Sequence, residues 1–435
     1  MVDLAHRGLI TVDGDHNFLD FESETALSEQ RKRKLTRKLL DIIEYAFNNS
    51  AAFKNRLNSH NLSPNDFKEI KDLEKLSTFD KNDILKTQSE GPPFGGMLGV
   101  DFKDIRRIYR SPGPIYEPGE RVYEDSRWAQ AFRAIGIGPG DIAVNTFSYH
   151  MTLFGFWLDD SLNSIGATII PSGPGNTDIL IELMAKMKIT TYLGTPSFLH
   201  SLSEKALSLG YDLKKDMQLR YGFVAAEMLP ESLRLNLENL FGMRLLQSYG
   251  TADIGCLGFE CGACHGMHVP EDVIVEILDP ETGKSLPAGE IGEIVATNFC
   301  KEYPLIRFAT GDLSYFIDEP CDCGRTSPRL GRILGRIDQL TKVRGMFIHP
   351  SQVIEVMQGF PEVKKFQVIV DRFKHKDSIT LLANVQTAGI DNINLKTIIE
   401  NALKNVVKLR IEVDFVGKDE FTESDRVIID KRQWD

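Results

Sequence analysis

The chain has 435 residues, enough for more than one domain with a large buried core. Its formal net charge at pH 7 is −11, which argues against a nucleic-acid-binding protein, because such proteins usually present a clustered basic surface. The N-terminal residues lack a basic segment followed by an apolar run, and no stretch approaches the roughly 18 apolar residues of a membrane span, so we expect neither a signal peptide nor a membrane protein.

The first hundred residues predict helices without visible chemistry. Apolar residues recur at helical spacing between Ser28 and Asn49, and a shorter helical piece is expected at Pro64–Glu74. We interpret this region as packing.

Between Tyr123 and Leu246 helix and strand patterns alternate, which predicts a parallel sheet covered on both faces. The expected strands and helices are Tyr123–Ile135 (helix), Ile142–Phe147 (strand), Leu153–Leu162 (helix), Thr168–Pro171 (strand), Ile179–Met187 (helix), a strand reaching Gly194, and Phe198–Leu207 (helix). Such sheets bind ligands at the carboxyl ends of their strands. Phe147 and Tyr149, at the end of the first strand, are therefore candidates to line a substrate site.

A buried strand from Met243 to Gln247 leads into Ser248-Tyr249-Gly250-Thr251-Ala252-Asp253. We expect a tight turn at Gly250, where no Cβ would obstruct a ligand. The turn would present a ring, a hydroxyl and a carboxylate side by side at the sheet edge. An ordinary strand-to-loop exit is the alternative.

Six cysteines in a chain of this length do not indicate a disulfide framework. Cys261, Cys264 and His268 lie within eight residues, and Cys321 and Cys323 form a second close pair. Close ligands on two separate turns suit a structural, tetrahedral Zn²⁺ site in a reducing cytosol. Buried thiols without a metal are the alternative.

Downstream, strands at Val273–Leu278 and Ile291–Asn298 around a turn at Asp279–Lys284 predict a smaller β-rich subdomain, which would contain the zinc site, at about residues 255–335. After Asp338 a new β/α pattern extends over ~100 residues, enough for a small domain. Its expected elements are strands at 341–343, 363–370, 379–385 and 410–416 and helices at 351–357 and 393–406. We therefore expect an α/β fold, with parallel-sheet layers in a large N-terminal domain (1–338) and a small α+β C-terminal domain (339–435).

Three further stretches accompany the Ser248–Asp253 motif. They are Val224-Ala225-Ala226-Glu227, Pro304-Leu305-Ile306-Arg307-Phe308-Ala309-Thr310-Gly311-Asp312 and Gly335-Arg336-Ile337-Asp338. In this order and at this spacing they resemble the AMP-forming acyl-CoA ligases, most closely the phenylacetate-CoA ligase family. The resemblance extends from about Ile105 to the C-terminus, and the Thr-Gly-Asp segment followed by Gly-Arg-x-Asp is its most specific part.

The resemblance implies a nucleotide site. The residues implied to bind the nucleotide are Ser111, Gly113, Ala225, Ala226, Glu227, Ser248, Tyr249, Gly250, Thr251, Asp312 and Arg336. Asp312 would bind both ribose hydroxyls, and Thr251 would reach the α-phosphate. Asp253 stands where the family has a glutamate that helps to hold Mg²⁺, and a shorter carboxylate still offers an oxygen ligand. Thr251, Asp253 and Arg426 are thus the candidate catalytic residues.

The chain departs from the family at two phosphate-handling elements. The family has a hydroxyl-rich loop with a lysine where this chain has Ser111–Pro118 with three prolines. Prolines donate no N–H, and Glu117, in place of the lysine, would repel a triphosphate. A stiff proline turn is the alternative interpretation. Near the C-terminus, the family's catalytic lysine is missing and Arg426 is the nearest cation, with a different shape and reach.

Some members of the resembled family have a Cys/His cluster like the one found here. They tend to match Cys261, His268, Cys321 and Cys323, which makes Cys264 the uncertain ligand. The resemblance also implies that the small C-terminal domain is a lid that rotates about a hinge at Asp338.

Our main hypothesis is an AMP-forming acyl-CoA ligase that activates an aromatic or related organic carboxylic acid through an acyl-adenylate and transfers it to CoA. It implies ATP or AMP, Mg²⁺, CoA and structural Zn²⁺ as ligands, a cytoplasmic location, and a homodimer as one option. The main alternative is a degenerate homologue that binds AMP or CoA without adenylating. A zinc-dependent nucleic-acid binder is a third hypothesis, which the acidic charge disfavours.

Overall fold

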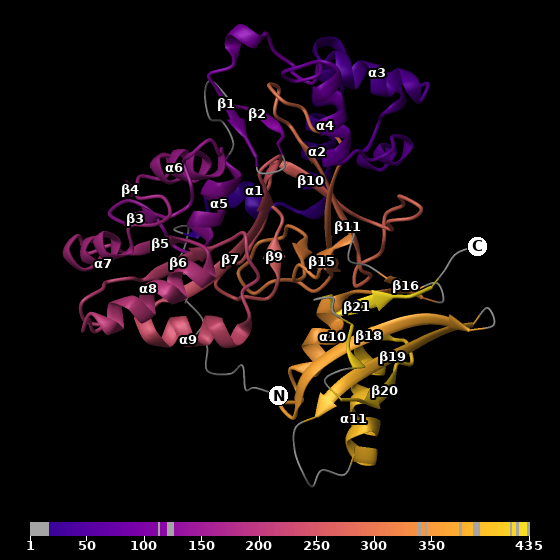
Figure 1. Cartoon of the computed structure of the whole chain (residues 1–435). Helices are drawn as coiled ribbons and strands as arrows, with labels where there is room; N and C mark the ends of the chain where they lie inside the picture. Colours follow the sequence, from indigo (N-terminus) through magenta and orange to yellow (C-terminus); the bar gives the residue numbers. More distant parts are fainter. Residues whose placement is uncertain are drawn as a thin grey trace. The chain divides into compact units, whose positions relative to one another are not determined.

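The computed structural model describes residues 17–111, 114–119, 126–337, 341–343, 346–373, 376–385, 392–417, 420–422 and 426–432. Two compact units can be distinguished by their internal contacts. The first comprises Met1–Thr310 with Ser314–Ile333, and the second comprises Gly311–Leu313 with Leu334–Asp435. In Figure 1, where colour follows the sequence, most of the second unit appears in orange and yellow.

A nine-stranded sheet lies at the centre of the first unit, in the order β13-β14-β9-β8-β7-β6-β5-β3-β4. Its strands are β3 (Ile142–Asn145), β4 (Thr168–Pro171), β5 (Thr191–Gly194), β6 (Tyr221–Val224), β7 (Arg244–Thr251), β8 (Gly255–Phe259), β9 (Met267–His268), β13 (Phe316–Ile317) and β14 (Arg329–Leu330). The strands from β4 to β7 are parallel, which confirms the predicted parallel sheet. The remaining four strands continue the sheet in antiparallel pairs.

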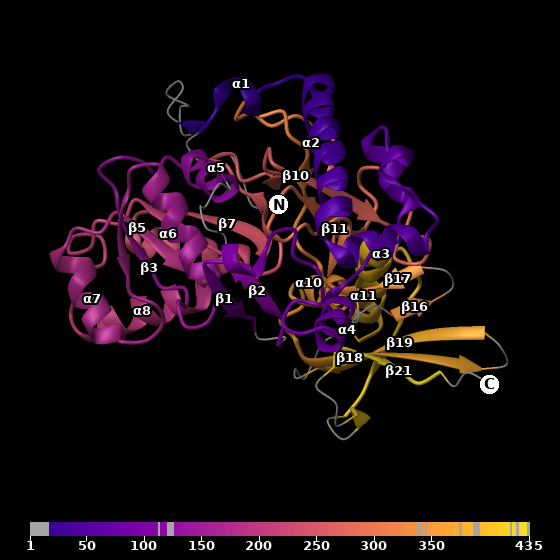
Figure 2. The same ribbon diagram turned by 90° about the horizontal axis from the view of Figure 1, so that it is seen from above.

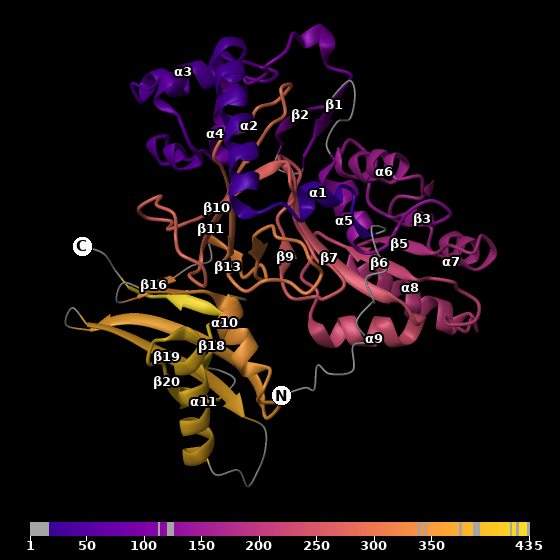
Figure 3. The same cartoon turned by 180° about the vertical axis from the view of Figure 1, so that it is seen from behind.

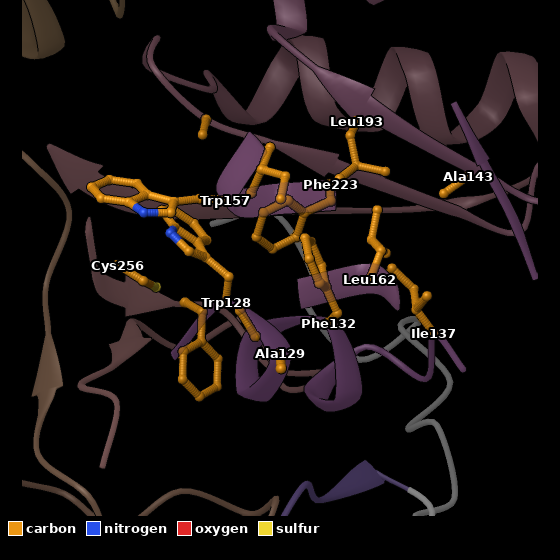
Figure 4. Close-up of a cluster of buried hydrophobic side chains, with 14 of the residues drawn as sticks. Trp128, Ala129, Phe132, Ile137, Ala143, Trp157, Leu162, Leu193, Phe223 and Cys256 are labelled. Carbon is orange, nitrogen blue, oxygen red and sulfur yellow. The ribbon is translucent and has the colours of Figure 1, made fainter. Parts of the chain in front are cut away.

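Helices cover both faces of the parallel part (Figure 1). They are α5 (Arg127–Ala134) and α6 (Phe154–Ser164) on one face and α7 (Thr177–Lys186), α8 (Pro196–Ser208) and α9 (Glu231–Phe241) on the other. Successive strand residues point to opposite faces, so Phe223 packs with α5 while Val224 joins the other core. Figure 4 shows Phe223 beside Trp128 and Phe132 of α5. Burial on both faces explains why the central strands β3, β5 and β6 are mostly apolar.

The N-terminal part of the first unit is helical, as predicted. Its elements are α1 (Phe21–Glu24), α2 (Ser28–Asn49), α3 (Ala51–Ser59), η3 (Pro64–Asp66), η4 (Ile70–Lys75), α4 (Lys81–Glu90) and η5 (Phe102–Asp104). The amphipathic helix α2 buries Leu39 and Ile43 in one cluster with Ile274, and Figure 2 shows α2 beside β10. Helix α4 is capped at its N-terminus by Asp80, whose side chain accepts hydrogen bonds from the amides of Asn82 and Asp83.

A four-stranded sheet has the order β10-β11-β12-β15. Its strands are β10 (Val273–Leu278), β11 (Gly292–Asn298), β12 (Phe308–Ser314) and β15 (Gly335–Arg336). The first two confirm the predicted strands, and the predicted turn between them is closed by a 2.9 Å hydrogen bond from Asp279 N to Lys284 O.

The second unit has a sheet in the order β20-β19-β18-β21. Its elements are β16 (Thr341–Val343), β17 (Met346–Ile348), α10 (Pro350–Met357), β18 (Val363–Phe373), β19 (Lys376–Val385), α11 (Asn392–Val407), β20 (Glu412–Phe415) and β21 (Ile428–Asp430). Residues of both helices and all four sheet strands share one hydrophobic core, and Figure 3 shows α11 alongside β20. Among the residues described in either unit, no helix is long and apolar enough to cross a membrane.

Candidate active site and metal centre

The carboxyl ends of the parallel strands lie next to one another. Thr146, directly after β3, donates its backbone N–H to Leu193 O at 2.9 Å, and Ala225 N donates to Gly194 O at 3.3 Å. On the other side of β3, Ser172 Oγ donates to Asn145 O at 3.2 Å. The ends of β3, β4, β5 and β6 therefore form one continuous edge, the location at which open α/β sheets bind ligands.

Ala225, Ala226 and Glu227 follow β6 at this edge. Ala226 adopts a left-handed backbone with φ of +69°, a conformation that costs a non-glycine residue energy and is often found at functional sites. The Glu227 carboxylate accepts a hydrogen bond from Ser197 Oγ at 2.9 Å and one from Ser197 N at 3.3 Å. Its charge is therefore held at the N-terminus of α8, where the helix dipole favours an anion.

Ser248, Tyr249, Gly250 and Thr251 lie within β7, which pairs with β8 through a β-bulge between Tyr249 and Gly250. The predicted tight turn at Gly250 is therefore wrong. A Cβ at this position would lie 2.5 Å from Gly255 O and 3.1 Å from the Trp128 ring. The glycine is required by the close approach of β8 and α5, and the chain turns after Thr251 instead.

The side chains of this strand contact the neighbouring sheet. Tyr249 Oη lies 3.2 Å from Thr310 Oγ1, which donates to Ile294 O at 2.9 Å. Ser248 is buried, and its hydroxyl has no hydrogen-bond partner among the described residues. The contact with Thr310 places Tyr249, one of the residues that the resemblance implies to bind the nucleotide, beside the start of the Thr-Gly-Asp segment.

Asp253 lies in the turn that Thr251 begins, where Ile254 N donates to Thr251 Oγ1 at 3.3 Å. Its side chain is only 1% exposed and forms a 3.1 Å ion pair with Lys81 Nζ of α4. Nothing in the sequence pattern indicated Lys81, because α4 is far from β7 in the chain and its lysine looks like an ordinary surface residue.

Glu117 lies in a hairpin that the sequence analysis missed, formed by β1 (Arg107–Arg110) and β2 (Tyr116–Gly119). Its side chain is buried, and burial raises its pKa to about 8, with Asp253 adding to the rise and Lys81 opposing it. At pH 7 the carboxyl group is therefore mainly protonated. The prediction that Glu117 is negatively charged and repels a triphosphate is therefore wrong at this pH. Desolvation of the buried carboxyl group keeps it protonated.

Of the two residues predicted for a phosphate-binding loop, Ser111 and Gly113, the structure describes Ser111. Ser111 N donates to Ile115 O at 3.0 Å and closes the connection between the strands. The Ser111 side chain is buried, so in this conformation it is not presented to solvent. Gly113, the other predicted loop residue, lies outside the described residues.

Asp312 and Arg336 face each other across β12 and β15. Arg336 Nη1 lies 3.3 Å from Asp312 Oδ1, with side-chain exposures of 47% and 19%. Gly311, which precedes Asp312 in β12, has φ of +78°, and a Cβ there would lie 2.6 Å from the Arg336 guanidinium. The glycine of the Thr-Gly-Asp motif thus leaves room for the arginine.

The two predicted substrate residues differ in exposure. Phe147 belongs to the hydrophobic core and packs edge-on against Phe154, with 4.6 Å between ring centroids. Tyr149 is half-buried, and its hydroxyl donates to Asp159 Oδ1 at 2.6 Å and accepts from Asn145 Nδ2 at 2.8 Å. Burial and the neighbouring carboxylate raise the pKa of Tyr149, so it remains a neutral phenol. In the second unit, Arg426 is exposed and its backbone carbonyl accepts a hydrogen bond from Gln367.

The Cys/His cluster has four members, and one atom from each lies within 4.8 Å of all the others: Cys261, His268, Cys321 and Cys323. Cys261 Sγ lies 3.6 Å from Cys321 Sγ, and Cys323 Sγ lies 3.3 Å from His268 Nε2. A tetrahedral Zn²⁺ ion implies about 3.8 Å between two sulfur ligands and about 3.5 Å between sulfur and nitrogen. The donor set and its spacing therefore fit zinc.

Surrounding groups orient these ligands. His268 Nδ1 lies 3.2 Å from Ser327 Oγ, which leaves Nε2 directed toward the sulfurs, as is usual for metal-binding histidines. The buried Arg329 binds the backbone carbonyls of His265 and Glu319 and so joins the two ligand-bearing turns. Hydrogen bonds from the thiols of Cys261 and Cys321 and from His268 lower the pKa of Cys323, while the same shared hydrogen bonds and burial raise the pKa values of Cys261 and Cys321.

Cys264 is outside the cluster. Its Sγ lies 3.9 Å from Gly262 O and 4.0 Å from Arg244 Nη2, and its backbone has φ of +53°. The geometry therefore favours His268 over Cys264 as the fourth ligand, a choice that spacing alone left open.

Two family models match the chain. One, described as AMP-binding enzyme, matches residues 161–299, and the other, described as AMP-binding enzyme C-terminal domain, matches residues 345–432. The first match contains the edge residues of β6 and β7, and the second lies within the second unit.

Curated relatives and solved structures agree with these matches. The phenylacetate-coenzyme A ligase of Thermus thermophilus is 29% identical over 84% of this chain and 83% of its own length, and that of Escherichia coli is 28% identical over 84% and 85%. Among solved structures, an open conformation of 2-hydroxyisobutyryl-CoA ligase in complex with 2-HIB-AMP and CoA has a TM-score of 0.88, covering 96% of this chain and 95% of that chain at 22% identity. This last similarity shows that the chain has the same fold.

Proposed function

Because the chain belongs to the adenylate-forming ligase superfamily, among relatives of phenylacetate-CoA ligase, we propose that it is an acid–thiol ligase acting on an aromatic or related organic carboxylic acid. The observation that supports this most strongly is the match to phenylacetate-coenzyme A ligases over 84% of the chain. In the first step, a carboxylate oxygen attacks the α-phosphorus of ATP and pyrophosphate leaves. In the second, the CoA sulfur attacks the acyl carbonyl, a thioester forms and AMP leaves.

The adenine would bind between the ends of β6 and β7. Val224 and Gln247 are paired neighbours in these strands, so Ala225–Glu227 and Ser248–Tyr249 extend side by side from adjacent strand ends. The left-handed backbone at Ala226 and the fixed Glu227 carboxylate give this wall a defined shape. Gly250, which has no side chain, lets β8 pack closely against β7, and this packing positions Ser248 and Tyr249.

The ribose and phosphates would be bound by the motif residues that follow. Asp312 would accept hydrogen bonds from the ribose hydroxyls, with Arg336 keeping its carboxylate oriented. Thr251 would bind the α-phosphate, and Asp253 would hold Mg²⁺, which neutralises phosphate charge when bound. Ser111 and Gly113 would contribute at most backbone contacts, because the Ser111 side chain is buried.

The remaining assignments concern the acid and the second unit. Tyr149 offers a neutral ring for the acid and packs edge-on against Phe156, and Phe147 would contribute from the adjoining core, where it packs against Phe154. Arg426 would supply a cation for the phosphate from the C-terminal domain (339–435), acting as a lid on the N-terminal domain (1–338). CoA as acceptor is supported by the ligase relatives, and a cytoplasmic location and a homodimer are part of the same proposal.

We also propose that Cys261, His268, Cys321 and Cys323 hold one structural Zn²⁺. Its support is the distance agreement described above and the complete burial of His268. Three thiolates and one imidazole complete a tetrahedron, which leaves no open position for a water, so the site would stabilise the fold and take no part in the reaction.

The test is acid-dependent release of pyrophosphate from ATP, with a panel of aromatic and aliphatic acids and with the Escherichia coli relative run in parallel. We expect pyrophosphate and AMP with a subset of the acids, and a CoA thioester when CoA is added. Binding of AMP without pyrophosphate release for any acid, while the relative turns over, would favour the degenerate homologue instead.

A further inference from the structure

The region around Asp253 needs a cation before it can accept a nucleoside triphosphate. The ligand brings about four negative charges, and the Asp253 carboxylate adds another. The segment Ser111–Pro118 contains no lysine or arginine. Two unit charges a few ångströms apart interact strongly in a partly buried site, so the sign of the nearest charge strongly affects binding.

Lys81, in helix α4, provides a cation beside Asp253. Its Nζ lies 3.1 Å from Asp253 Oδ2, and the two side chains differ sharply in exposure, at 39% for Lys81 and 1% for Asp253. The ammonium group is therefore on the solvent side of a buried carboxylate. An anion that approaches Asp253 from solvent meets the Lys81 ammonium first.

Helix α4 is fixed so that Lys81 stays in this place. Gln88 lies on one face of the same helix. Its Nε2 donates a hydrogen bond to Tyr116 O at 2.8 Å, and its Oε1 accepts one from Tyr116 N at 2.9 Å. Tyr116 directly precedes Glu117, so α4 is joined to the strand where the missing loop lysine would stand. Ile84 is fully buried on the same side of the helix.

From this geometry we propose that Lys81 binds the β- and γ-phosphates of ATP beside Asp253, in place of a lysine in the 111–118 segment. The proposal rests on the ligase function proposed above. An ammonium group has three donors, and Asp253 is the ion-pair partner of Lys81 within the described part of the chain, so two donors can turn toward phosphate oxygens.

The experiment compares ATP and AMP binding by calorimetry for the full chain and the variants Lys81→Met, Lys81→Arg and Lys86→Met. No Mg²⁺ is added and the buffers are freed of divalent cations beforehand, so that a metal at Asp253 does not contribute while the proposed structural zinc stays bound. Lys81→Met should weaken ATP binding by about tenfold to a hundredfold, as expected for one charge-assisted hydrogen bond, and AMP binding by less than about threefold. Lys81→Arg should retain most of the affinity, and Lys86→Met, an exposed position on the same helix, should change neither ligand.

A double mutant distinguishes phosphate binding from simple neutralisation of Asp253. If Lys81 only compensates the buried carboxylate, Lys81→Met should cost no ATP affinity when it is made in the Asp253→Asn background, and the proposal is overturned. If Lys81 contacts phosphate, Lys81→Met/Asp253→Asn should bind ATP more weakly than Asp253→Asn alone. The proposal is also overturned if Lys81→Met loses the same affinity for ATP and AMP, or loses no affinity for either. Thermal unfolding shows whether each variant folds. If Lys81→Met does not fold, the ATP affinity of Lys81→Arg tests the proposal instead. A selective ATP effect without acid-dependent pyrophosphate release would instead refute the ligase function and leave the phosphate site standing.

Discussion

The proposed metal centre takes its ligands from two short turns, whereas the proposed nucleotide site takes its residues from β6, β7, the β1–β2 hairpin and α4. In the first, residue type and spacing specify the chemistry, because two close Cys/His groups have few other uses. At the nucleotide site, the charge of a side chain depends on partners that are distant in the chain. Lys81, Glu117 and Asp253 show this, since each has a neighbour that its own sequence motif does not contain.

This difference also determines which site tolerates change. A zinc site loses its metal when one ligand is removed, because the remaining three no longer complete the tetrahedron. A nucleotide site distributes binding over many contacts, so single changes should alter affinity or pH dependence and leave the fold intact. Mutations of the two regions should therefore have different dominant effects.

The largest effect is expected for Cys323→Ser. Loss of the metal should lower the free energy of unfolding by several kcal/mol, because metal binding in such sites is coupled to folding. Metal analysis and thermal unfolding test this, with Cys300→Ser, outside the cluster, as the control. A wild-type protein with less than about half an equivalent of zinc would contradict the metal assignment.

The next largest effect is expected for Glu117→Gln as a change in pH dependence. The pKa of Glu117 is about 8 in the folded chain and 4.5 ordinarily, so the folded state holds a proton that the unfolded state has lost between these values. Stability should thus fall as pH rises from about 5 to 8, by at most about 1.4 kcal/mol per pH unit.

Chemical denaturation at several pH values measures this dependence. Glu117→Gln should remove part of the slope, and Glu90→Gln, exposed at the end of α4, should retain it. Identical slopes for the wild type and Glu117→Gln would mean that Glu117 is ionised in the folded protein.

A third effect concerns Asp312→Ala. A carboxylate that accepts two hydrogen bonds from a ribose contributes roughly 1.5–3 kcal/mol for each, so AMP binding should weaken by at least about a hundredfold. Calorimetry with AMP tests this, and Asp178→Ala, a 74% exposed side chain on α7, is the matched control. Unchanged AMP affinity in Asp312→Ala would remove this residue from the nucleotide site.

Much of the fold could be predicted because burial leaves a pattern in the sequence. The apolar runs at β3, β4 and β5 and the amphipathic pattern of α2 each reflect a local periodicity. The β1–β2 hairpin was missed because three prolines and a resemblance to a phosphate loop suggested a turn.

The misinterpretation of Gly250 has a similar cause. A glycine after a strand often marks a turn, but here it accommodates the backbone of β8 and the ring of Trp128. A sequence shows that a position requires a small residue, and only tertiary structure shows which neighbour imposes the requirement. The same reasoning explains why Lys81 could not be predicted, since an ion pair across the fold leaves no periodic signal.

The smallest effect is expected for Cys264→Ser, which tests the choice of the fourth metal ligand. Its sulfur lies 3.9 Å from Gly262 O and 4.0 Å from Arg244 Nη2, which are long, weak contacts, and serine is close to cysteine in size. We expect unchanged zinc content and a stability change within about 0.5 kcal/mol. His268→Ala is the comparison, because His268 is fully buried with Nε2 3.3 Å from Cys323 Sγ and its loss should release the metal. If Cys264→Ser released zinc and His268→Ala retained it, the ligand set would be three cysteines with Cys264, and the turn at 261–268 would have to rearrange when the metal binds.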